Sequence, residues 1–238
     1  MTQATAEQVA DYGKAMFERI VRELNAVRDD SFTHLAAIKN LAGDTTGYAH
    51  VYTSDRARRL AHLSIDIMPG MRYFNIFGCP SDDFDAPRFL HEGMISTRGS
   101  QVSTDIFHAV DMETRVKDIL AKTGGLTEIY DEARASSLNF EPSRYAHMRI
   151  FCSPHFLCAF GADGEELPQI AAYGDRYLSE WLKMLAASDR VDAAEAKKRR
   201  ERRIHMSNMM VELDPDRHMV VQVYGEDTVQ AIEEACMY

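Results

Sequence analysis

The chain has 238 residues, of which 45% are hydrophobic, and this is enough to bury the core of one domain. Its net charge of −10 argues against a nucleic-acid partner, because neutralising phosphates requires a broad basic surface. No apolar stretch approaches the roughly 18 residues of a membrane span and the N-terminus does not resemble a signal peptide, so we expect one cytoplasmic, monomeric domain over residues 1–238 without a membrane partner.

The first segment predicts an amphipathic helix. Thr5 and Gln8 resemble a capping box that opens a helix. Apolar residues then recur at steps of three and four, at Val9, Tyr12, Met16, Ile20, Leu24 and Val27. This spacing indicates a helix that packs one face on the rest of the domain.

A change to period two indicates β-strands after a turn at residues 43–47. Leu63, Ile65 and Ile67 alternate with His62, Ser64 and Asp66, so one face of this strand is apolar and the other polar. Further strand-like runs follow at 71–77, 91–97 and 101–110. Consecutive strands with short links favour an antiparallel meander.

The second half of the chain is mainly helical. Residues 148–160 suit a strand or a buried loop, and helices are predicted over 167–185, 191–211 and 227–237. Strands in the middle and helices at both ends predict an α+β fold in which helices cover both faces of one antiparallel sheet.

The sequence indicates no cofactor of its own. Residues 161–164 lack the spacing of a nucleotide-binding loop, and the histidines are scattered without metal-ligand spacing. We expect reduced, mostly buried thiols at the four cysteines, Cys79, Cys152, Cys158 and Cys236. We therefore expect no metal and no bound cofactor, and any electrons for a redox reaction must come from outside the chain.

The polar strand face is a candidate site. His62, Ser64 and Asp66 should point together, and such a face either meets solvent or lines a pocket. Helices over both sheet faces favour the pocket, with Asn75 and Glu92 on neighbouring strands, because covered polar residues need partners or a ligand.

Short motifs in a consistent order resemble those of the ferredoxin-dependent bilin reductases. Pro87-Arg-Phe89-Leu-His-Glu92 resembles the family's Pro-x-Phe-Gly-x-Asp and is followed, as there, by a Gly/Gln/Ser strand. Phe151-Cys-Ser153-Pro154-His-Phe-Leu157 is similar to Phe-Ser-Pro-x-x-Leu. The terminal Asp-Pro-x-Arg-x-Met and Phe-Gly-Glu elements are matched by Asp214-Pro-Asp216-Arg217-His-Met219 and Val223-Tyr224-Gly225-Glu226.

The resemblance implies a three-layer α/β/α sandwich that holds biliverdin between an antiparallel sheet and C-terminal helices. It implies sequential one-electron reduction of biliverdin by reduced ferredoxin, with protons from side chains. Glu92 falls on the sheet carboxylate that protonates the bilin, and Asp214 on a second carboxylate, although Asp214 also suits a helix N-cap. We expect the catalytic residues to be Glu92, Asp214 and Asn75, and the substrate-binding residues to be His62, Ser64, Asp66, Ser103 and Arg217.

Two departures from the family pattern leave alternatives open. Glu92 is one methylene longer than the family's Asp, and a basic partner for a propionate is absent at Ala159-Phe160. A non-catalytic tetrapyrrole carrier or sensor, or a reductase of an open-chain chlorophyll catabolite, are the alternatives. Asn75, and Ser64 where the phycocyanobilin branch uses a Glu, favour reduction at the A-ring or the C15 bridge over the D-ring vinyl.

A basic run interrupts the otherwise acidic chain. Lys197-Lys198-Arg199-Arg200-Glu201-Arg202-Arg203 holds six cations in seven positions. The run is either a solvated helix face or a docking patch for an acidic protein, and the resemblance implies that this partner is ferredoxin.

Overall fold

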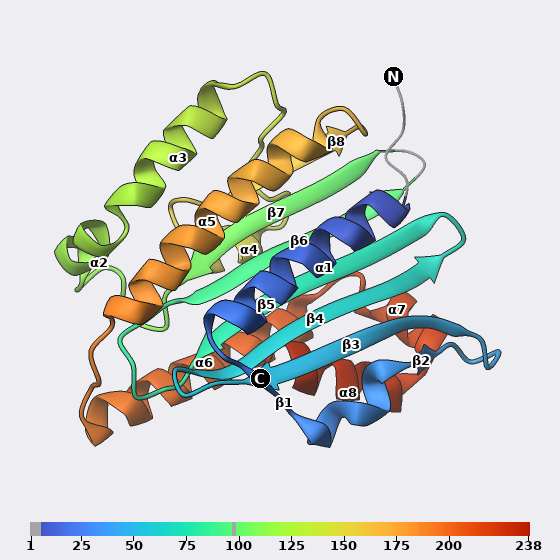
Figure 1. Cartoon of the computed structure of the whole chain (residues 1–238), viewed down its shortest axis with the longest axis horizontal. Coiled ribbons are helices and arrows are strands. Elements are labelled where there is room, and N and C mark those ends of the chain that lie inside the picture. Colours follow the sequence, from blue (N-terminus) through green and yellow to red (C-terminus); the bar gives the residue numbers. More distant parts are fainter. Residues whose placement is uncertain (1–5, 97–98) are drawn as a thin grey trace.

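The computed structural model describes residues 6–96 and 99–238, and its side chains from residue 13 onward. A single antiparallel sheet forms the middle layer (Figure 1). Its strands follow the spatial order β1-β3-β4-β5-β6-β7-β8, and β2 pairs with β3. The strands are β1 (Val27–Arg28), β2 (Ile38–Lys39), β3 (Thr45–Thr53), β4 (Ala57–Met68), β5 (Met71–Pro80), β6 (Arg88–Ser96), β7 (Ser100–Phe107) and β8 (Leu157–Ala162). The expected meander is therefore confirmed from β4 to β7, and β3, which the sequence analysis did not predict, extends it by one strand.

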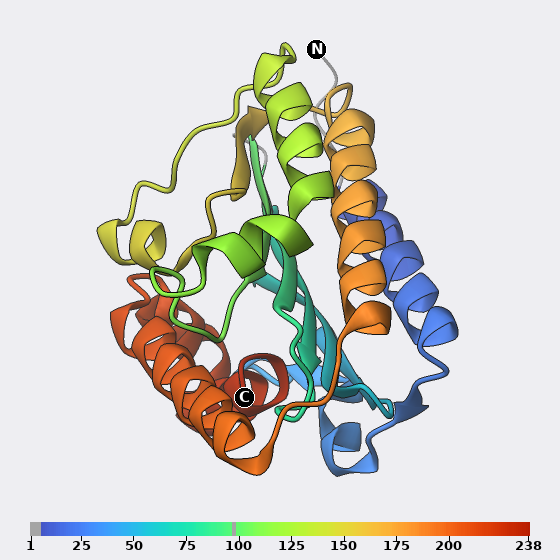
Figure 2. The ribbon, with the colours of Figure 1, turned by 90° about the vertical axis from the view of Figure 1, so that its left-hand side faces the viewer.

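Helices cover both faces of the sheet, as Figure 2 shows with the sheet seen edge-on. One outer layer consists of α1 (Ala6–Glu23), α3 (Gly124–Ala135) and α5 (Leu167–Ala187). The other contains α4 (Ala146–Phe151), α6 (Ala193–Leu213), α7 (Arg217–Tyr224) and α8 (Glu226–Cys236). A short α2 (Val116–Lys122) and a 3-10 helix (Asp30–Ala36) complete the described elements. This arrangement confirms the α/β/α sandwich.

Strand register decides which side chains share a face of the sheet. Leu63, Asn75, Glu92, Ser103 and Cys158 lie directly opposite one another on five neighbouring strands. Residues aligned in this way point to the same side, because side chains alternate along each strand. We call this side the Glu92 face, and it is covered by α4, α6, α7 and α8.

Each face has its own hydrophobic core. On the side of α1 and α5, Trp181 is fully buried and its Nε1 donates to the Pro87 carbonyl at 2.9 Å. Gly78 allows this contact, because a Cβ there would lie 2.6 Å from the Trp181 ring. On the Glu92 face, Leu63 and Ile65 pack with Val229 and other apolar residues of α7 and α8.

Several element boundaries differ from those predicted. The first helix ends at Glu23 rather than Val27, because Asn25 adopts a positive φ of 47° and the chain then enters β1. Residues 148–160 divide between α4 and β8, and a separate α7 follows α6. The predicted cap at Thr5 and the predicted strand end at Thr97 lie outside the described residues.

The four cysteines are buried and free in the described structure. Across residues 6–96 and 99–238, no group of His, Cys, Asp and Glu side chains is arranged to hold a metal ion. None of the described helices combines the length and the apolar composition that a membrane crossing demands.

Candidate functional site

Glu92 is the centre of a polar group on the Glu92 face. The Tyr73 hydroxyl donates to Glu92 Oε2 at 2.6 Å, and Asn75 Nδ2 donates to the Tyr73 hydroxyl at 3.1 Å. Ser103 Oγ lies 3.5 Å from Glu92 Oε1. Three neighbouring strands, β5, β6 and β7, therefore hold this group within an otherwise apolar surface.

The surroundings of Glu92 favour its protonated form. Burial raises the pKa of the carboxyl, and the charge of Asp214 raises it further, whereas hydrogen bonds from Tyr73, Asn75 and Ser103 lower it. Burial and the neighbouring carboxyl raise the pKa of Tyr73 well above its ordinary value. The phenol therefore remains a hydrogen-bond donor, and the carboxyl is suited to hold a proton at a pH where an exposed Glu is ionised.

Helix α6 brings Asp214 towards Glu92. Ser207 Oγ accepts from Arg88 Nη1 at 3.3 Å, which places this part of α6 over the start of β6. Asp214 lies about 10 Å beyond Ser207 along α6, and Glu92 lies about 13 Å beyond Arg88 along β6. The charge of Asp214 acts on Glu92 and raises the pKa of its carboxyl. Asp214 is exposed, but desolvation by the surrounding protein raises the pKa of its carboxyl, and its Oδ1 accepts from Asp216 N at 2.9 Å.

Strand pairing thus brings Asn75, Glu92 and Ser103 together, and Asp214 is near enough for its charge to act on Glu92. The structure adds Tyr73, which sequence reasoning missed. Its position two residues before Asn75 on the same strand places both side chains on one face, and this alternation is the pattern that could have found it.

A cation lies at the edge of the Glu92 face. The Arg144 guanidinium sits 4.9 Å over the ring of Phe160, which pairs with Gln101 on this face. Arg144 is exposed, and its turn is held by a bond from Arg149 Nη1 to the Ser143 carbonyl at 2.7 Å. The local sequence at Ala159-Phe160 has no basic residue, and Arg144 supplies a cation at this place from another segment of the chain.

Asp105 is a second buried carboxyl that the sequence analysis did not single out. It accepts from Ser153 N at 2.9 Å and from Ser153 Oγ, and burial raises its pKa to about 6. Since these bonds hold the Ser153-Pro154 turn against β7, part of the Ser-Pro motif has a structural role.

His62 and Ser64 do not join Glu92, which corrects the prediction that they line its pocket. In-register pairing of Leu63 with Asn75 puts Leu63 on the Glu92 face, and alternation then places His62 and Ser64 on the opposite face. Both side chains are buried there, and His62 lies between Phe17 and Tyr48. Burial lowers the pKa of His62 to about 4.

Two other residues that were predicted to bind the substrate, Asp66 and Arg217, form ion pairs within the protein. Asp66 binds Arg72 through two bonds, Nε to Oδ1 at 2.7 Å and Nη2 to Oδ2 at 3.0 Å. Arg217 Nε donates to Glu233 Oε1 at 2.6 Å, and its Nη2 donates to Glu226. The bonds of Arg217 to Glu226 and Glu233 link α7 to α8. Asp66 and Arg217 therefore both have partners within the protein.

The basic run on α6 is divided between interior and surface. Arg199 and Arg203 are each 4% exposed and pair with Asp85 and Asp82, respectively. The run is therefore not a single docking patch, because its helical period turns two of its cations inward. The cations left on the surface are Lys197, Lys198, Arg200 and Arg202.

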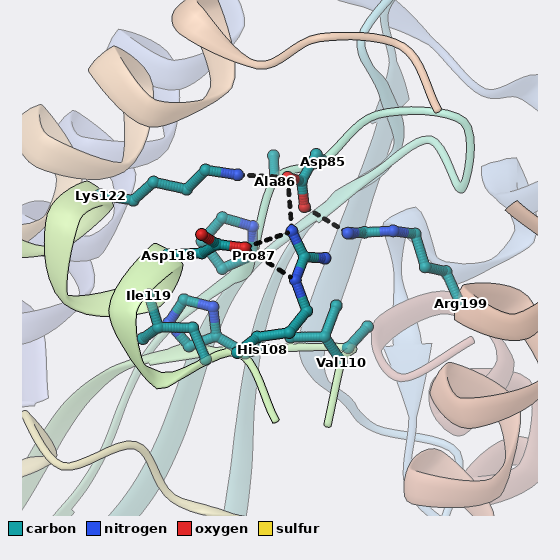
Figure 3. Close-up of a pocket in the computed structure, with 11 residues that line it drawn as sticks. Asp85, Ala86, Pro87, His108, Val110, Asp118, Ile119, Lys122 and Arg199 are labelled. Carbon is teal, nitrogen blue, oxygen red and sulfur yellow. Dashed lines mark hydrogen bonds and ion pairs between the residues drawn. The ribbon is translucent and has the colours of Figure 1, made fainter. Parts of the chain in front are cut away.

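A small pocket beside this helix is filled with ion pairs (Figure 3). Asp85 is paired there with Arg115, Lys122 and Arg199. The pocket has a volume of about 20 Å³, which is enough for about one water molecule. This pocket is too small for a tetrapyrrole. Its ion pairs connect α2 with α6 through Asp85.

No protein-family model and no curated protein matches the sequence. The fold matches that of phytochromobilin synthase from tomato, solved in complex with biliverdin, with a TM-score of 0.77 and 16% sequence identity over 96% of this chain and 81% of that chain. The structure of PcyX is also similar, with a TM-score of 0.44 and 12% identity over 88% and 86% of the two chains. The first of these matches confirms the fold that the resemblance implied.

Proposed function

We propose that this protein binds biliverdin on the Glu92 face and reduces it with electrons from reduced ferredoxin. The observation that carries the proposal is the Glu92 carboxyl, which is set among apolar side chains with a raised pKa and lies near a second carboxyl, Asp214. The likeness to a fold that binds biliverdin in phytochromobilin synthase supports the choice of ligand.

Asn75 supplies a polar contact suited to a bilin. Its Oδ1 is buried and has no hydrogen-bond partner among the described residues. An unpaired buried acceptor is costly, and a ligand that donates a hydrogen bond there removes the cost. The lactam and pyrrole N–H groups of an open-chain tetrapyrrole are such donors.

The reduction needs two electrons and two protons for each carbon–carbon double bond. Two molecules of reduced ferredoxin provide one electron each, and we assign the protons to Glu92 and Asp214. A side chain whose pKa is raised towards the working pH is an effective proton donor in this role.

Ferredoxin is proposed to dock on the exposed cations of α6, namely Lys197, Lys198, Arg200 and Arg202. Ferredoxins are acidic, and a local positive surface on an acidic protein steers such a partner. The buried Arg199 and Arg203 take no part in this surface.

We expect the product to be reduced at the A-ring or the C15 bridge. Leu63, rather than Ser64, lies beside Asn75, and it has no proton to give to a D-ring vinyl group. Chromatography of the product should find the D-ring vinyl intact, and phycocyanobilin as the main product would refute this expectation.

The deciding experiment is anaerobic incubation with biliverdin, ferredoxin and a ferredoxin-reducing system. We expect the biliverdin absorption to disappear as a reduced bilin forms, and only when reduced ferredoxin is present. Binding with an unchanged biliverdin spectrum over time would reject the enzyme and leave a carrier or sensor. Tighter binding of an open-chain chlorophyll catabolite would reassign the substrate.

The carrier or sensor is the second candidate function. It is favoured by Glu92, whose side chain is one methylene longer than the Asp of the family pattern. A displacement of about 1 Å at a reacting group is enough to reduce the rate strongly.

A further inference from the structure

Within the proposed function, we infer that Tyr73 determines which oxygen of Glu92 carries the proton that is delivered to the bound tetrapyrrole. Tyr73 is a positioning residue in this scheme, and Glu92 remains the group that touches the substrate. Its contacts with Asn75 and Glu92, together with the contact of Glu92 with Ser103, produce this effect.

The direction of the hydrogen bonds follows from the donors available. Asn75 Nδ2 lies 3.1 Å from the Tyr73 hydroxyl and has only protons to offer, so the hydroxyl accepts there. The single proton of the phenol is then directed to Glu92 Oε2, 2.6 Å away. Asn75 therefore orients Tyr73, and Tyr73 orients Glu92.

This bond makes the two oxygens of Glu92 different. Oε2 accepts from Tyr73, so the proton of the neutral carboxyl belongs on Oε1. The neighbour of Oε1 is Ser103 Oγ at 3.5 Å, which is a long contact compared with an ordinary O–H···O bond. Oε1 therefore keeps its proton available for a ligand on this face.

The proton balance is simple. After the tetrapyrrole accepts an electron, the O–H bond at Glu92 Oε1 breaks and the proton joins the reduced ligand. The resulting carboxylate keeps the hydrogen bond from Tyr73 and is protonated again from solvent. Tyr73 gives up no proton, because burial and the nearby carboxyl raise the pKa of its phenol well above the ordinary value.

The arrangement also accounts for the longer side chain at position 92. Glu has one more rotatable bond than Asp, so its carboxyl needs an additional restraint to stay in one orientation. The phenol of Tyr73 provides that restraint from the neighbouring strand.

The test is the Tyr73→Phe variant, which removes only the hydroxyl. The hydrogen bond from Tyr73 stabilises ionised Glu92, so its loss should raise the pKa of Glu92 by about one unit. Infrared titration of the Glu92 carboxyl, identified by its loss in Glu92→Gln, measures this shift in the ligand-free protein. The pH at which biliverdin turnover declines should move upward by the same amount.

Turnover kinetics distinguish a lost orientation of the Glu92 carboxyl from general damage to the fold of the Tyr73→Phe variant. We expect kcat to fall about tenfold in Tyr73→Phe with KM for biliverdin unchanged, because the proton is no longer held on one oxygen. Tyr52→Phe removes a hydroxyl from a half-buried tyrosine that packs on Phe17, and should alter neither the pH dependence nor kcat. In a Glu92→Asp background we expect the side chain, shorter by one methylene, to lose the contact with the phenol, so Tyr73→Phe should change kcat less than about twofold.

An unchanged carboxyl titration in Tyr73→Phe would overturn the inference, as would a full effect of Tyr73→Phe in the Glu92→Asp background. Failure of the proposed function has a different signature. The wild-type protein would then leave biliverdin unreduced, while the infrared titration would still report whether Tyr73 controls Glu92.

Discussion

At the scale of single residues, the properties of Glu92 are produced by its neighbours. Apolar surroundings and Asp214 raise its pKa, and the hydrogen bonds from Tyr73, Asn75 and Ser103 act in the opposite direction. Burial is the largest of these effects. The carboxyl is thus tuned by the strands on either side of it and by the helix end that faces it.

Replacing Glu92 by Gln tests its role as a proton donor. The amide keeps the shape of the side chain and removes the acidic proton, so biliverdin reduction should fall at least about 100-fold. Biliverdin affinity should change less than about threefold, which anaerobic kinetics and a binding titration can establish. The exposed Glu165→Gln serves as the matched control, and turnover near wild type in Glu92→Gln would assign the proton to another group.

Replacing Arg144 by Gln tests whether this cation holds a propionate of biliverdin. We expect KM for biliverdin to rise about tenfold with little change in kcat, because a charged hydrogen bond to a propionate is lost. Biliverdin dimethyl ester has no free propionates, so its affinity should be the same for wild type and Arg144→Gln. Equal losses for the acid and the ester would indicate damage to the site instead.

At the scale of elements, helix α6 links three tasks. Its inward arginines, Arg199 and Arg203, pair with the loop between β5 and β6. Its outward cations face solvent, and its C-terminal end leads into Asp214. One helix therefore leads into a catalytic candidate and carries the charged surface on which we propose that ferredoxin docks.

Substitutions on the buried side of α6 should change the free energy of unfolding, and those on its exposed side should change ferredoxin-dependent turnover. Arg203→Gln leaves Asp82 without its partner in a largely buried setting and should lower the free energy of unfolding by about 2 kcal/mol. The double variant Lys198→Gln with Arg200→Gln should change it by less than about 0.5 kcal/mol. The double variant should instead slow ferredoxin-dependent turnover at low salt and weaken its salt dependence.

Urea unfolding and turnover at several salt concentrations measure both effects. A stable Arg203→Gln protein with impaired ferredoxin turnover would return this arginine to the docking surface. A salt dependence unaltered by the double variant would show that its two cations form only a solvated helix face.

At the scale of the whole molecule, burial of histidines makes stability depend on pH. The pKa values of His62 and His108 are lowered to about 4 and that of His91 to about 3, in each case mainly by burial. The unfolded chain therefore binds more protons than the folded one below about pH 6.5, and stability is lost as the pH falls towards these values. Asp105 acts in the opposite sense between about pH 4 and 6, because its pKa is raised to about 6, and the raised pKa values of Glu92 and Asp214 act in the same sense as that of Asp105.

His62→Phe isolates one of these contributions. The Nε2 atom of His62 has no hydrogen-bond partner in the described structure, and the ring already packs among aromatic side chains. The slope of the unfolding free energy against pH should decrease by the equivalent of about one proton near pH 5. Urea unfolding from pH 4.5 to 7 measures the slope, and exposed His205→Gln should leave it unchanged. An equal slope in wild type and His62→Phe would show that His62 is not the buried neutral group described here.

Local pattern in the sequence predicted the fold class but not every element, because β3, α2 and α3 were not predicted. Period-two alternation in β4 and helical spacing in α5 and α8 reflect burial on one side of each element, so they identified the central sheet, its meander and the covering helices. The family resemblance also pointed to Glu92, Asn75 and Ser103, which lie opposite one another on neighbouring strands.

Only the tertiary structure decided which polar side chains share a face. A strand pattern says that His62 and Leu63 point in opposite directions, but the pairing of Leu63 with Asn75 determines which of them accompanies Glu92. Arg144 reaches Phe160 from a distant segment, and the inward turn of Arg199 and Arg203 depends on acids contributed by another loop. These contacts join residues far apart in the chain, so no local periodicity records them.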